Sequence, residues 1–236
     1  MAVVIGVMNG KGGVGKTTLS IVIAGQVAIQ KRRAVILDCD DRQNAMRWWQ
    51  MCAKSGRRPD HLDVRSAADP RETGRALAKA DGEAEFVICD LEGRNTDLAG
   101  FVLSRADMIV CPAQPTAPDM AGVIQVKQFL DRFEELRGRP VPMVCVVNRM
   151  TLILEHTNAY KKRAELAEKL GFGLLSTVVW NRKPYVEMMD GIGTIQTMDA
   201  QHEPVAKAQR EAAALVSEIV GTIMQHRRAA APAAVA

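Results

Sequence analysis

Hydrophobic positions along the chain fall into short runs that alternate with longer stretches of helical period. The short runs are rich in Val and Ile, and several lack the strict apolar–polar alternation of a half-exposed strand. Runs of that kind are typical of strands that helices cover on both faces. The pattern predicts strands at 2–8, 34–38, 62–66, 85–90, 107–112, 141–147 and 174–179. It predicts helices at 16–31, 43–54, 70–80, 117–136, 157–170 and 203–226.

This order of strands and helices predicts the fold class. We expect an α/β protein with a mostly parallel, twisted sheet flanked by helices on both faces. No Gly/Ser linker or internal repeat interrupts the chain, so we expect one domain over residues 1–228. Residues 229–236 are Ala, Pro and Val only, and we predict that they form a disordered tail.

The composition agrees with an ordinary globular protein. Of 236 residues, 47% are hydrophobic and 25% are charged, which excludes intrinsic disorder. The net charge of +4 is spread evenly over the chain, so composition alone gives no argument for a DNA-binding face. The five cysteines are widely spaced and include no C-x-x-C pair, which indicates buried thiols in a reducing compartment. No apolar run approaches the roughly 18 residues that span a bilayer, and we expect a cytoplasmic protein.

A glycine-rich segment lies between the first predicted strand and the first predicted helix. Its sequence, NGKGGVGKTT, begins at Asn9, and Gly10, Gly15, Lys16 and Thr17 match the phosphate-loop pattern G-x4-G-K-[ST]. Glycines let backbone N–H groups turn toward phosphate oxygens, and the following helix adds the positive end of its dipole. We expect Lys16 to reach the β- and γ-phosphates and the Thr17 hydroxyl to bind Mg²⁺. The predicted nucleotide-binding residues of this segment are Gly12, Gly13, Val14, Gly15, Lys16, Thr17 and Thr18.

A second lysine, Lys11, precedes Lys16 by five residues, and an ordinary phosphate loop does not need it. The segment KGGVGKTT that starts at Lys11 resembles the deviant Walker A motif of the ParA/MinD superfamily of ATPases. The resemblance implies a P-loop NTPase fold of the deviant Walker A type, ATP and Mg²⁺ as cofactors, and a homodimer that encloses ATP. It also implies that Lys11 crosses the dimer interface to contact the partner's ATP. A cation delivered in that way neutralises charge in the transition state and couples hydrolysis to dimerisation.

The strand predicted at 34–38 ends in a cluster of carboxylates. The sequence there resembles the family's D-x-D-P-Q segment, with Asp38 and Asp40 as its two aspartates. The resemblance implies that Asp38 assists the hydration shell of Mg²⁺ and that Asp40 positions the attacking water. Asp41 and Arg42 stand where one proline is common, so Gln43 is displaced by one position and receives no role.

Two more strand ends supply predicted site residues. Asp90 follows an apolar strand in the manner of a Walker B aspartate and is expected to hold Mg²⁺ through water. Gly93, shortly after it, would let the backbone approach the γ-phosphate. Asn148 resembles the family's base-contacting position and is expected to hydrogen-bond adenine, and the guanine-selective N-K-x-D motif is absent. Residues 108–119 resemble the strand and loop that lie across the family's dimer interface.

The resemblance favours a small ParA-type partition ATPase, cytoplasmic and associated with the nucleoid. Such proteins bind DNA non-specifically as ATP dimers, and a ParB-like centromere-binding or adaptor protein stimulates a weak ATPase activity. The predicted DNA contacts are basic residues in the last third of the chain: Lys161, Lys162, Arg163, Arg182, Lys183, Lys207 and Arg210. The C-terminal segment has no bulky apolar face, so no membrane partner is expected.

Two alternatives stay open. The segment from Asp40 to Trp48 resembles the overdrive-binding ATPases of T-DNA transfer systems, which bind a specific DNA site and assist a relaxase. A scaffold that bridges DNA without hydrolysing ATP is the other alternative. The intact carboxylates of Asp38, Asp40 and Asp90 argue against the scaffold.

Overall fold

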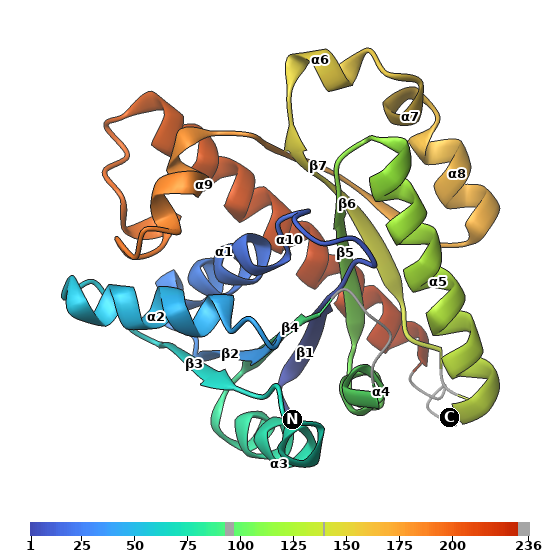
Figure 1. The fold of residues 1–236 in the computed structure, drawn as a ribbon, viewed down its shortest axis with the longest axis horizontal. Coiled ribbons are helices and arrows are strands. Elements are labelled where there is room, and N and C mark those ends of the chain that lie inside the picture. The colour runs from blue at the N-terminus through green and yellow to red at the C-terminus, as the bar shows by residue number, and fades with distance from the viewer. Residues whose placement is uncertain (93–96, 139, 231–236) are drawn as a thin grey trace, which may run out of the picture.

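The computed structural model describes residues 1–92, 97–138 and 140–230. In these residues seven strands form one sheet with the order β3-β2-β4-β1-β5-β6-β7, and every neighbouring pair is parallel (Figure 1). The strands are β1 (Val3–Val7), β2 (Ala34–Cys39), β3 (Leu62–Ser66), β4 (Phe86–Leu91), β5 (Met108–Ala113), β6 (Met143–Met150) and β7 (Gly173–Trp180). The helices are α1 (Lys16–Ile29), α2 (Asn44–Lys54), α3 (Pro70–Glu83), α4 (Asp97–Leu103), α5 (Ala117–Arg137), α6 (Leu152–Glu155), α7 (Asn158–Lys161), α8 (Arg163–Leu170), α9 (Lys183–Met188) and α10 (Glu203–Ala230), with a short 3₁₀ turn at Ile195–Thr197. The predicted fold class is confirmed.

Helices cover both faces of the sheet, and each face has its own core. One core joins the sheet to α1, α2, α9 and α10, and the other joins it to α3, α4, α5 and α8. Strand β1 contributes side chains to both cores, because Val3, Ile5 and Val7 point to the first core while Val4 points to the second. Successive side chains of a strand face opposite sides, so a strand buried on both faces reads as an unbroken apolar run.

Several predicted elements differ from the structure. The helix expected at 157–170 is divided into α7 and α8, and the Thr157 hydroxyl caps α7 by accepting from the Tyr160 N–H at 3.3 Å. The sequence pattern does not predict α4, α6 and α9, since four to seven residues give too little helical period to detect. Helix α10 continues to Ala230, so the first two residues of the predicted tail are helical, and 231–236 lie outside the described residues. All five cysteines are buried free thiols, as predicted.

The edge strand β7 leaves regular pairing in its middle. Cys145 and Val147 are two residues apart on β6, but their partners Leu174 and Val178 are four residues apart on β7. Glu218 on helix α10 accepts hydrogen bonds from two N–H groups of this bulge, those of Ser176 and Thr177. Within the described residues, no helix has the length and apolar character needed to cross a membrane.

Candidate functional site

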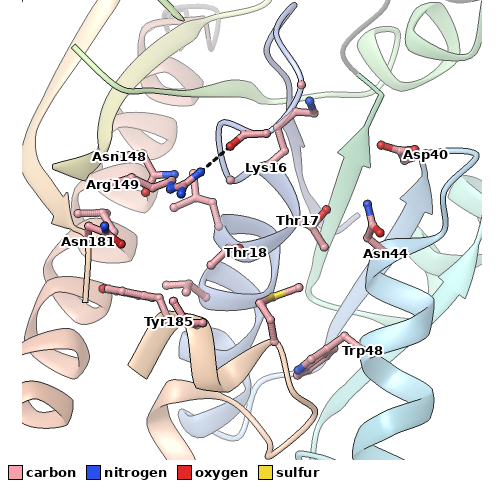
Figure 2. A pocket seen from close by; sticks show the side chains of 18 of the residues that line it. Lys16, Thr17, Thr18, Asp40, Asn44, Trp48, Asn148, Arg149, Asn181 and Tyr185 are labelled. Carbon is pink, nitrogen blue, oxygen red and sulfur yellow. Dashed lines mark hydrogen bonds between the residues drawn. The ribbon is translucent and has the colours of Figure 1, made fainter. Parts of the chain in front are cut away.

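Eight of the predicted nucleotide-site residues line one pocket of about 610 Å³ at the carboxyl ends of the central strands (Figure 2). Lys11, Val14, Asp38, Asp90 and the predicted DNA contacts are not part of its lining. This edge is where open parallel sheets bind ligands. Most of the phosphate loop lines the pocket, and Asp40 and Asn148 face it from two other elements. The lining residues from the loop and the start of α1 are Gly12, Gly13, Gly15, Lys16, Thr17 and Thr18.

The phosphate loop needs glycine at two positions for a steric reason. Gly13 and Gly15 have φ values of +80° and +94°, a region that side chains disfavour. A Cβ on Gly15 would also lie 2.6 Å from the side-chain nitrogen of Asn148. Val14 is buried instead of lining the pocket.

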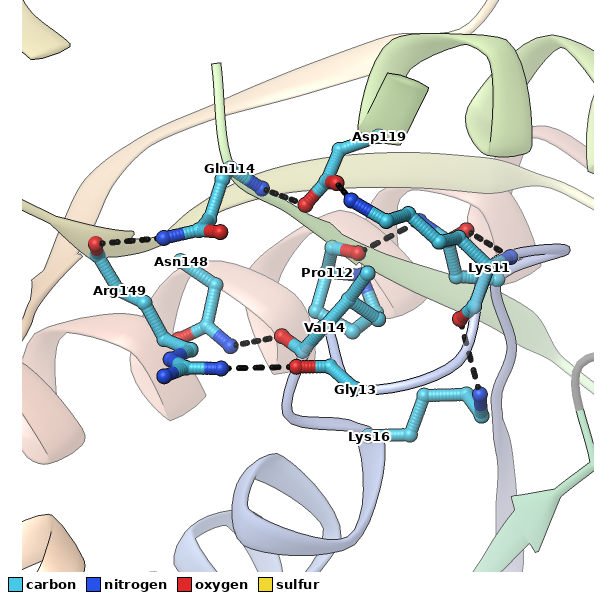
Figure 3. Close-up of polar contacts among 10 residues, drawn as sticks. Lys11, Gly13, Val14, Lys16, Pro112, Gln114, Asp119, Asn148 and Arg149 are labelled. Carbon is cyan, nitrogen blue, oxygen red and sulfur yellow. Dashed lines mark hydrogen bonds and ion pairs between the residues drawn. The ribbon is translucent and has the colours of Figure 1, made fainter. Parts of the chain in front are cut away.

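Strand β6 supports the loop from the side (Figure 3). Asn148 donates from Nδ2 to the carbonyl oxygen of Val14 at 2.8 Å, and Arg149 donates from Nη1 to that of Gly13 at 2.8 Å. Arg149 has φ +53°, which is uncommon outside glycine. Arg149 carries no signal in the sequence, because no motif marks a residue that supports the loop. Contact between Asn148 and adenine stays a prediction, and the structure adds that this amide holds the loop.

Lys11 is held within its own chain. Its Nζ forms an ion pair with Asp119 at the start of α5, whose side chain is only 1% exposed (Figure 3). The other oxygen of Asp119 accepts from the Gln114 N–H at 2.9 Å. Asn9 completes the arrangement, since its Oδ1 accepts from the Lys11 N–H and its Nδ2 donates to the Pro112 carbonyl, both at 2.8 Å. The contact of Lys11 with a partner's nucleotide stays a prediction.

Asp38 and Asp90 lie side by side as register partners at the ends of β2 and β4, and both are buried. Burial raises the pKa of Asp90 to about 7, although the Thr17 hydroxyl and the Lys16 ammonium oppose this rise. Burial also raises the pKa of Asp38. In the described part of the chain, Asp90 Oδ2 has no hydrogen-bond partner.

These groups fit a hydrated magnesium ion. Mg²⁺ keeps several waters and takes one or two carboxylates together with substrate phosphates. An unpartnered carboxylate oxygen beside a second carboxylate and the Thr17 hydroxyl meets that description. Among the described residues there is no group of three His, Cys, Asp or Glu side chains that could hold a metal by itself. Phosphate and water oxygens would therefore complete the coordination.

The turn after β2 presents Asp40 to the pocket. Asp38 Oδ2 accepts from the Met46 N–H at 2.9 Å, and Asp40 Oδ1 accepts from the Arg42 N–H at 2.9 Å. Gln43 has φ +51° and donates from Nε2 to the Asp40 carbonyl at 2.9 Å. Gln43 thus helps to fix the turn that carries Asp40, a role that its sequence position did not indicate.

The far wall of the pocket is apolar and aromatic. It is formed by Trp180 at the end of β7 and by Met189 after α9. The buried rings of Trp48 on α2 and Tyr185 on α9 lie at the same wall (Figure 2). Trp48 Nε1 donates to the Met188 carbonyl at 2.9 Å, which joins α2 to α9. Flat apolar walls beside a few polar groups suit a planar ring such as a nucleobase.

The predicted DNA contacts fall into three groups. The acceptors Glu211, Glu187 and Glu203 pair with Arg182, Lys183 and Lys207 at 2.6–2.8 Å, so these three charges are locally compensated. Arg163 stacks on the Tyr160 ring, with 3.6 Å from its guanidinium carbon to the ring centre. Lys161, Lys162 and Arg210 are exposed. Gly93 lies outside the described residues.

An all-parallel sheet with a glycine-rich phosphate loop after β1 and a buried aspartate ending β4 defines a P-loop nucleotide-binding protein. The family model described as "CobQ/CobB/MinD/ParA nucleotide binding domain" matches residues 5–220. The chain belongs to this family, and the predicted resemblance to the ParA/MinD superfamily is confirmed.

Individual relatives agree with this placement. The chain is 24% identical to protein ParA of Rhizobium radiobacter over 216 residues, covering 92% of this chain and 95% of that protein. It is 31% identical over 122 residues to maintenance of carboxysome distribution protein A of Gloeobacter kilaueensis, covering 52% and 54%. It is 20% identical over 161 residues to protein virC1 of R. radiobacter, covering 68% and 69%.

Solved structures show the same fold. The cell division ATPase MinD of Pyrococcus furiosus superposes with a TM-score of 0.71 at 16% identity, covering 94% of this chain and all of that one. MinD from Pyrococcus horikoshii, complexed with Mg-ADP, has a TM-score of 0.68 at 15% identity, covering 94% and 99%. A magnesium nucleotide, the predicted ligand here, is thus bound in one of these related structures.

Proposed function

We propose that this protein is a Mg²⁺-dependent ATPase of the ParA type that positions DNA. Two molecules enclose ATP, the dimer binds DNA non-specifically, and a ParB-like or adaptor protein stimulates a weak ATPase activity. The arrangement drives partition or positioning of a plasmid or chromosome on the nucleoid. The observation that carries the proposal is a phosphate loop with two lysines, Lys11 and Lys16, beside the unpartnered oxygen of Asp90. Relatives named ParA and carboxysome distribution protein A support positioning as the role.

Each side chain has a definite task in this proposal. When bound, Mg²⁺ neutralises charge on the β- and γ-phosphate oxygens. Thr17 and, through water, Asp90 would hold the ion, and Asp38 would orient its waters. Lys16 holds the phosphates, and its Nζ already lies in the loop, 3.3 Å from the Lys11 carbonyl.

Hydrolysis needs two further groups. Asp40 lines the pocket and would position the water that attacks the γ-phosphate. Lys11 of each molecule would leave Asp119 and neutralise charge on the nucleotide of its partner, as an arginine finger does. Asn148 and the aromatic wall would hold adenine. ATP hydrolysis would therefore require dimerisation.

DNA binding in this proposal rests on phosphate contacts. Of the predicted residues, Lys161, Lys162 and Arg210 are exposed, and among the described residues none of the three forms an ion pair with a carboxylate. Many weak contacts of this kind give affinity without sequence preference and a steep dependence on salt.

The decisive experiment measures DNA binding by the purified protein without nucleotide, with ADP and with ATP, over a salt series. Random DNA and candidate-site DNA are compared, and Lys16→Ala, which should lose nucleotide binding, serves as the control. Salt-sensitive binding that needs ATP and ignores sequence is expected. Preference for one site would move the proposal to the conjugative-transfer ATPase that assists a relaxase. Absence of DNA binding in every nucleotide state would refute the proposed use of DNA.

A further inference from the structure

One segment of the chain carries positive charge without any nearby negative charge in sequence. Between Asp41 and Asp60 there are five basic residues and no acidic residue. This run does not show in the net charge, which is spread evenly over the chain. We call four of its members, Arg47, Lys54, Arg57 and Arg58, the α2 surface; all four are exposed.

Helix α2 orients these charges away from the core. Its buried residues, Ala45, Trp48, Trp49 and Cys52, follow helical spacing and face the sheet. Arg47 and Lys54 are seven residues apart, which places them on one face of the helix about 10 Å from each other, with Arg47 at the border of the pocket. The chain then turns at Gly56, where φ is +67°, and Arg57 and Arg58 continue the same charged segment.

Where the structure describes the chain, the basic residues of the α2 surface are not paired with carboxylates, unlike several other arginines of the molecule. Arg65, Arg105, Arg182 and Arg227 each pair with a carboxylate. Within residues 1–92, 97–138 and 140–230, the four residues of the α2 surface form no ion pair with a carboxylate. Uncompensated cations on a fixed element are the electrostatic feature of a surface that meets a polyanion.

The backbone that carries the α2 surface is closely packed, and one of the four side chains is held against it. The Arg58 guanidinium stacks over the Trp49 ring at 4.5 Å from its centre. Ser55 Oγ donates to the Gly191 carbonyl at 2.7 Å, and a Cβ on Gly191 would lie 2.3 Å from that of Met51. Close packing therefore fixes the end of α2 against the segment after α9. A backbone that is already fixed loses little conformational entropy when the surface binds.

We propose that the α2 surface is a second DNA-binding surface, which contacts the phosphate backbone of duplex DNA. The inference rests on the proposed function, because it takes DNA as the partner. Arginine predominates here, and its planar guanidinium pairs with phosphate through two parallel hydrogen bonds. Met51, at 38% exposure, is the large apolar side chain on this helix face, whereas the core of a protein interface is apolar and poor in charge.

The position of α2 connects this surface to the nucleotide site. The same helix begins directly after the turn that carries Asp40, and its Met46 N–H donates to Asp38. Arg47 itself lines the pocket. A phosphate backbone bound along α2 would therefore contact the element that holds the proposed Mg²⁺ and water-positioning carboxylates.

The test uses the double variant Lys54→Gln/Arg57→Gln, whose two residues lie outside the pocket lining. The control is Arg71→Gln/Lys79→Gln on α3, which removes the same charge on the opposite side of the sheet. DNA affinity is measured with ATP over a salt series, together with ATPase activity and thermal unfolding. We expect the α2 variant to bind at least about tenfold more weakly at 0.1 M salt, with the salt slope reduced by about 2. The control should bind as the unmodified protein does.

The outcomes separate this inference from the proposed function. If the α2 variant keeps the affinity and salt slope of the unmodified protein while Lys161→Gln/Lys162→Gln loses them, the α2 surface is refuted and the proposed function stands. If the unmodified protein does not bind DNA with ATP, both are refuted. A loss of affinity by the α3 control equal to that of the α2 variant would also overturn the inference, since the effect would then be one of net charge.

Discussion

Lys11 and Asp119 form an ion pair that joins the phosphate loop to the first turn of α5, across 108 positions of sequence. The carboxylate is 1% exposed, while the lysine side chain is 42% exposed. Lys11 can therefore leave the pair toward solvent, but Asp119 cannot follow it. Under the proposed function, the partner's nucleotide and Asp119 compete for the same ammonium group.

This competition predicts the effect of Asp119→Asn. Asparagine keeps the size of the side chain but removes the charge that holds Lys11. We expect ATP-dependent dimerisation to become about ten- to thirtyfold tighter, because a dimer gives up two such ion pairs and a partly exposed pair contributes up to about 1 kcal/mol. Sedimentation at several protein concentrations measures the change.

A matched control exists on the same helix. Asp131→Asn breaks the ion pair of Asp131 with Lys127, a pair that lies within one helix, and should leave dimerisation unchanged. If Asp119→Asn weakens the ATP-dependent dimer, Asp119 supports the dimer and does not compete with it.

Asp40 is the proposed water-positioning residue, and its removal should separate binding from hydrolysis. Asp40→Ala should still bind ATP and dimerise, since the residues that hold the phosphates are intact. Turnover should fall about a hundredfold or more, the contribution typical of a positioned acid–base group. The control is Asp41→Ala at the exposed neighbouring position. The measurement is the steady-state rate of ATP hydrolysis at saturating ATP. Full turnover by Asp40→Ala would show that Asp40 does not position the attacking water.

The sequence was sufficient to predict the parts of this molecule that depend on local order. Strands buried on both faces appear as apolar runs, so β1 and β4 could be located. The phosphate-loop motif between a strand and a helix was enough to place Lys16 and Thr17 at the start of the helix. Asp38 and Asp90 could be placed at one edge because parallel strands end together.

Contacts between distant segments could not be predicted in this way. No pattern connects Arg149 with the carbonyl of Gly13 or Lys11 with Asp119, because each pair meets only after the strands are ordered in the sheet. The sequence also does not show which basic side chains pair with a carboxylate, for the same reason. Arg182 was predicted as a DNA contact from its neighbours in sequence, and its pairing with Glu211 depends on the packing of α9 against α10.

Asn148 provides a test of the support for the phosphate loop. Asn148→Ala leaves the buried Val14 carbonyl without its donor and opens space beside Gly15. Loss of a buried partner costs about 1–3 kcal/mol. We therefore expect weaker binding of both Mg-ATP and Mg-GTP, measured by calorimetry. Asn181→Ala removes an amide from the same pocket but keeps the bond to the loop, so it is the control. A loss confined to ATP would show that Asn148 contacts adenine and that the loop does not depend on it.

Glu218 holds the bulge of β7, and this contact makes the stability of the edge strand depend on pH. Its Oε1 accepts from the Ser176 N–H at 2.6 Å and its Oε2 from the Thr177 N–H at 3.0 Å. Burial alone would raise the pKa of Glu218, but these backbone hydrogen bonds outweigh it and lower the pKa below the usual 4.5. The folded state therefore favours the charged carboxylate. The stabilisation is complete above pH 4.5 and is lost as the pH falls through the lowered pKa.

Glu218→Gln removes this dependence, because glutamine has one acceptor oxygen and turns an amide donor toward the other N–H group. We expect the free energy of unfolding at pH 7 to fall by about 1 kcal/mol. The difference from the unmodified protein should shrink as the pH falls below 4.5, where protonation removes the same acceptor from Glu218. Urea unfolding at pH 7, 5 and 3.5 measures it, with Glu165→Gln on the exposed face of α8 as the control. A difference that stays constant over this range would show that the contact acts through packing and not through the charge of the carboxylate.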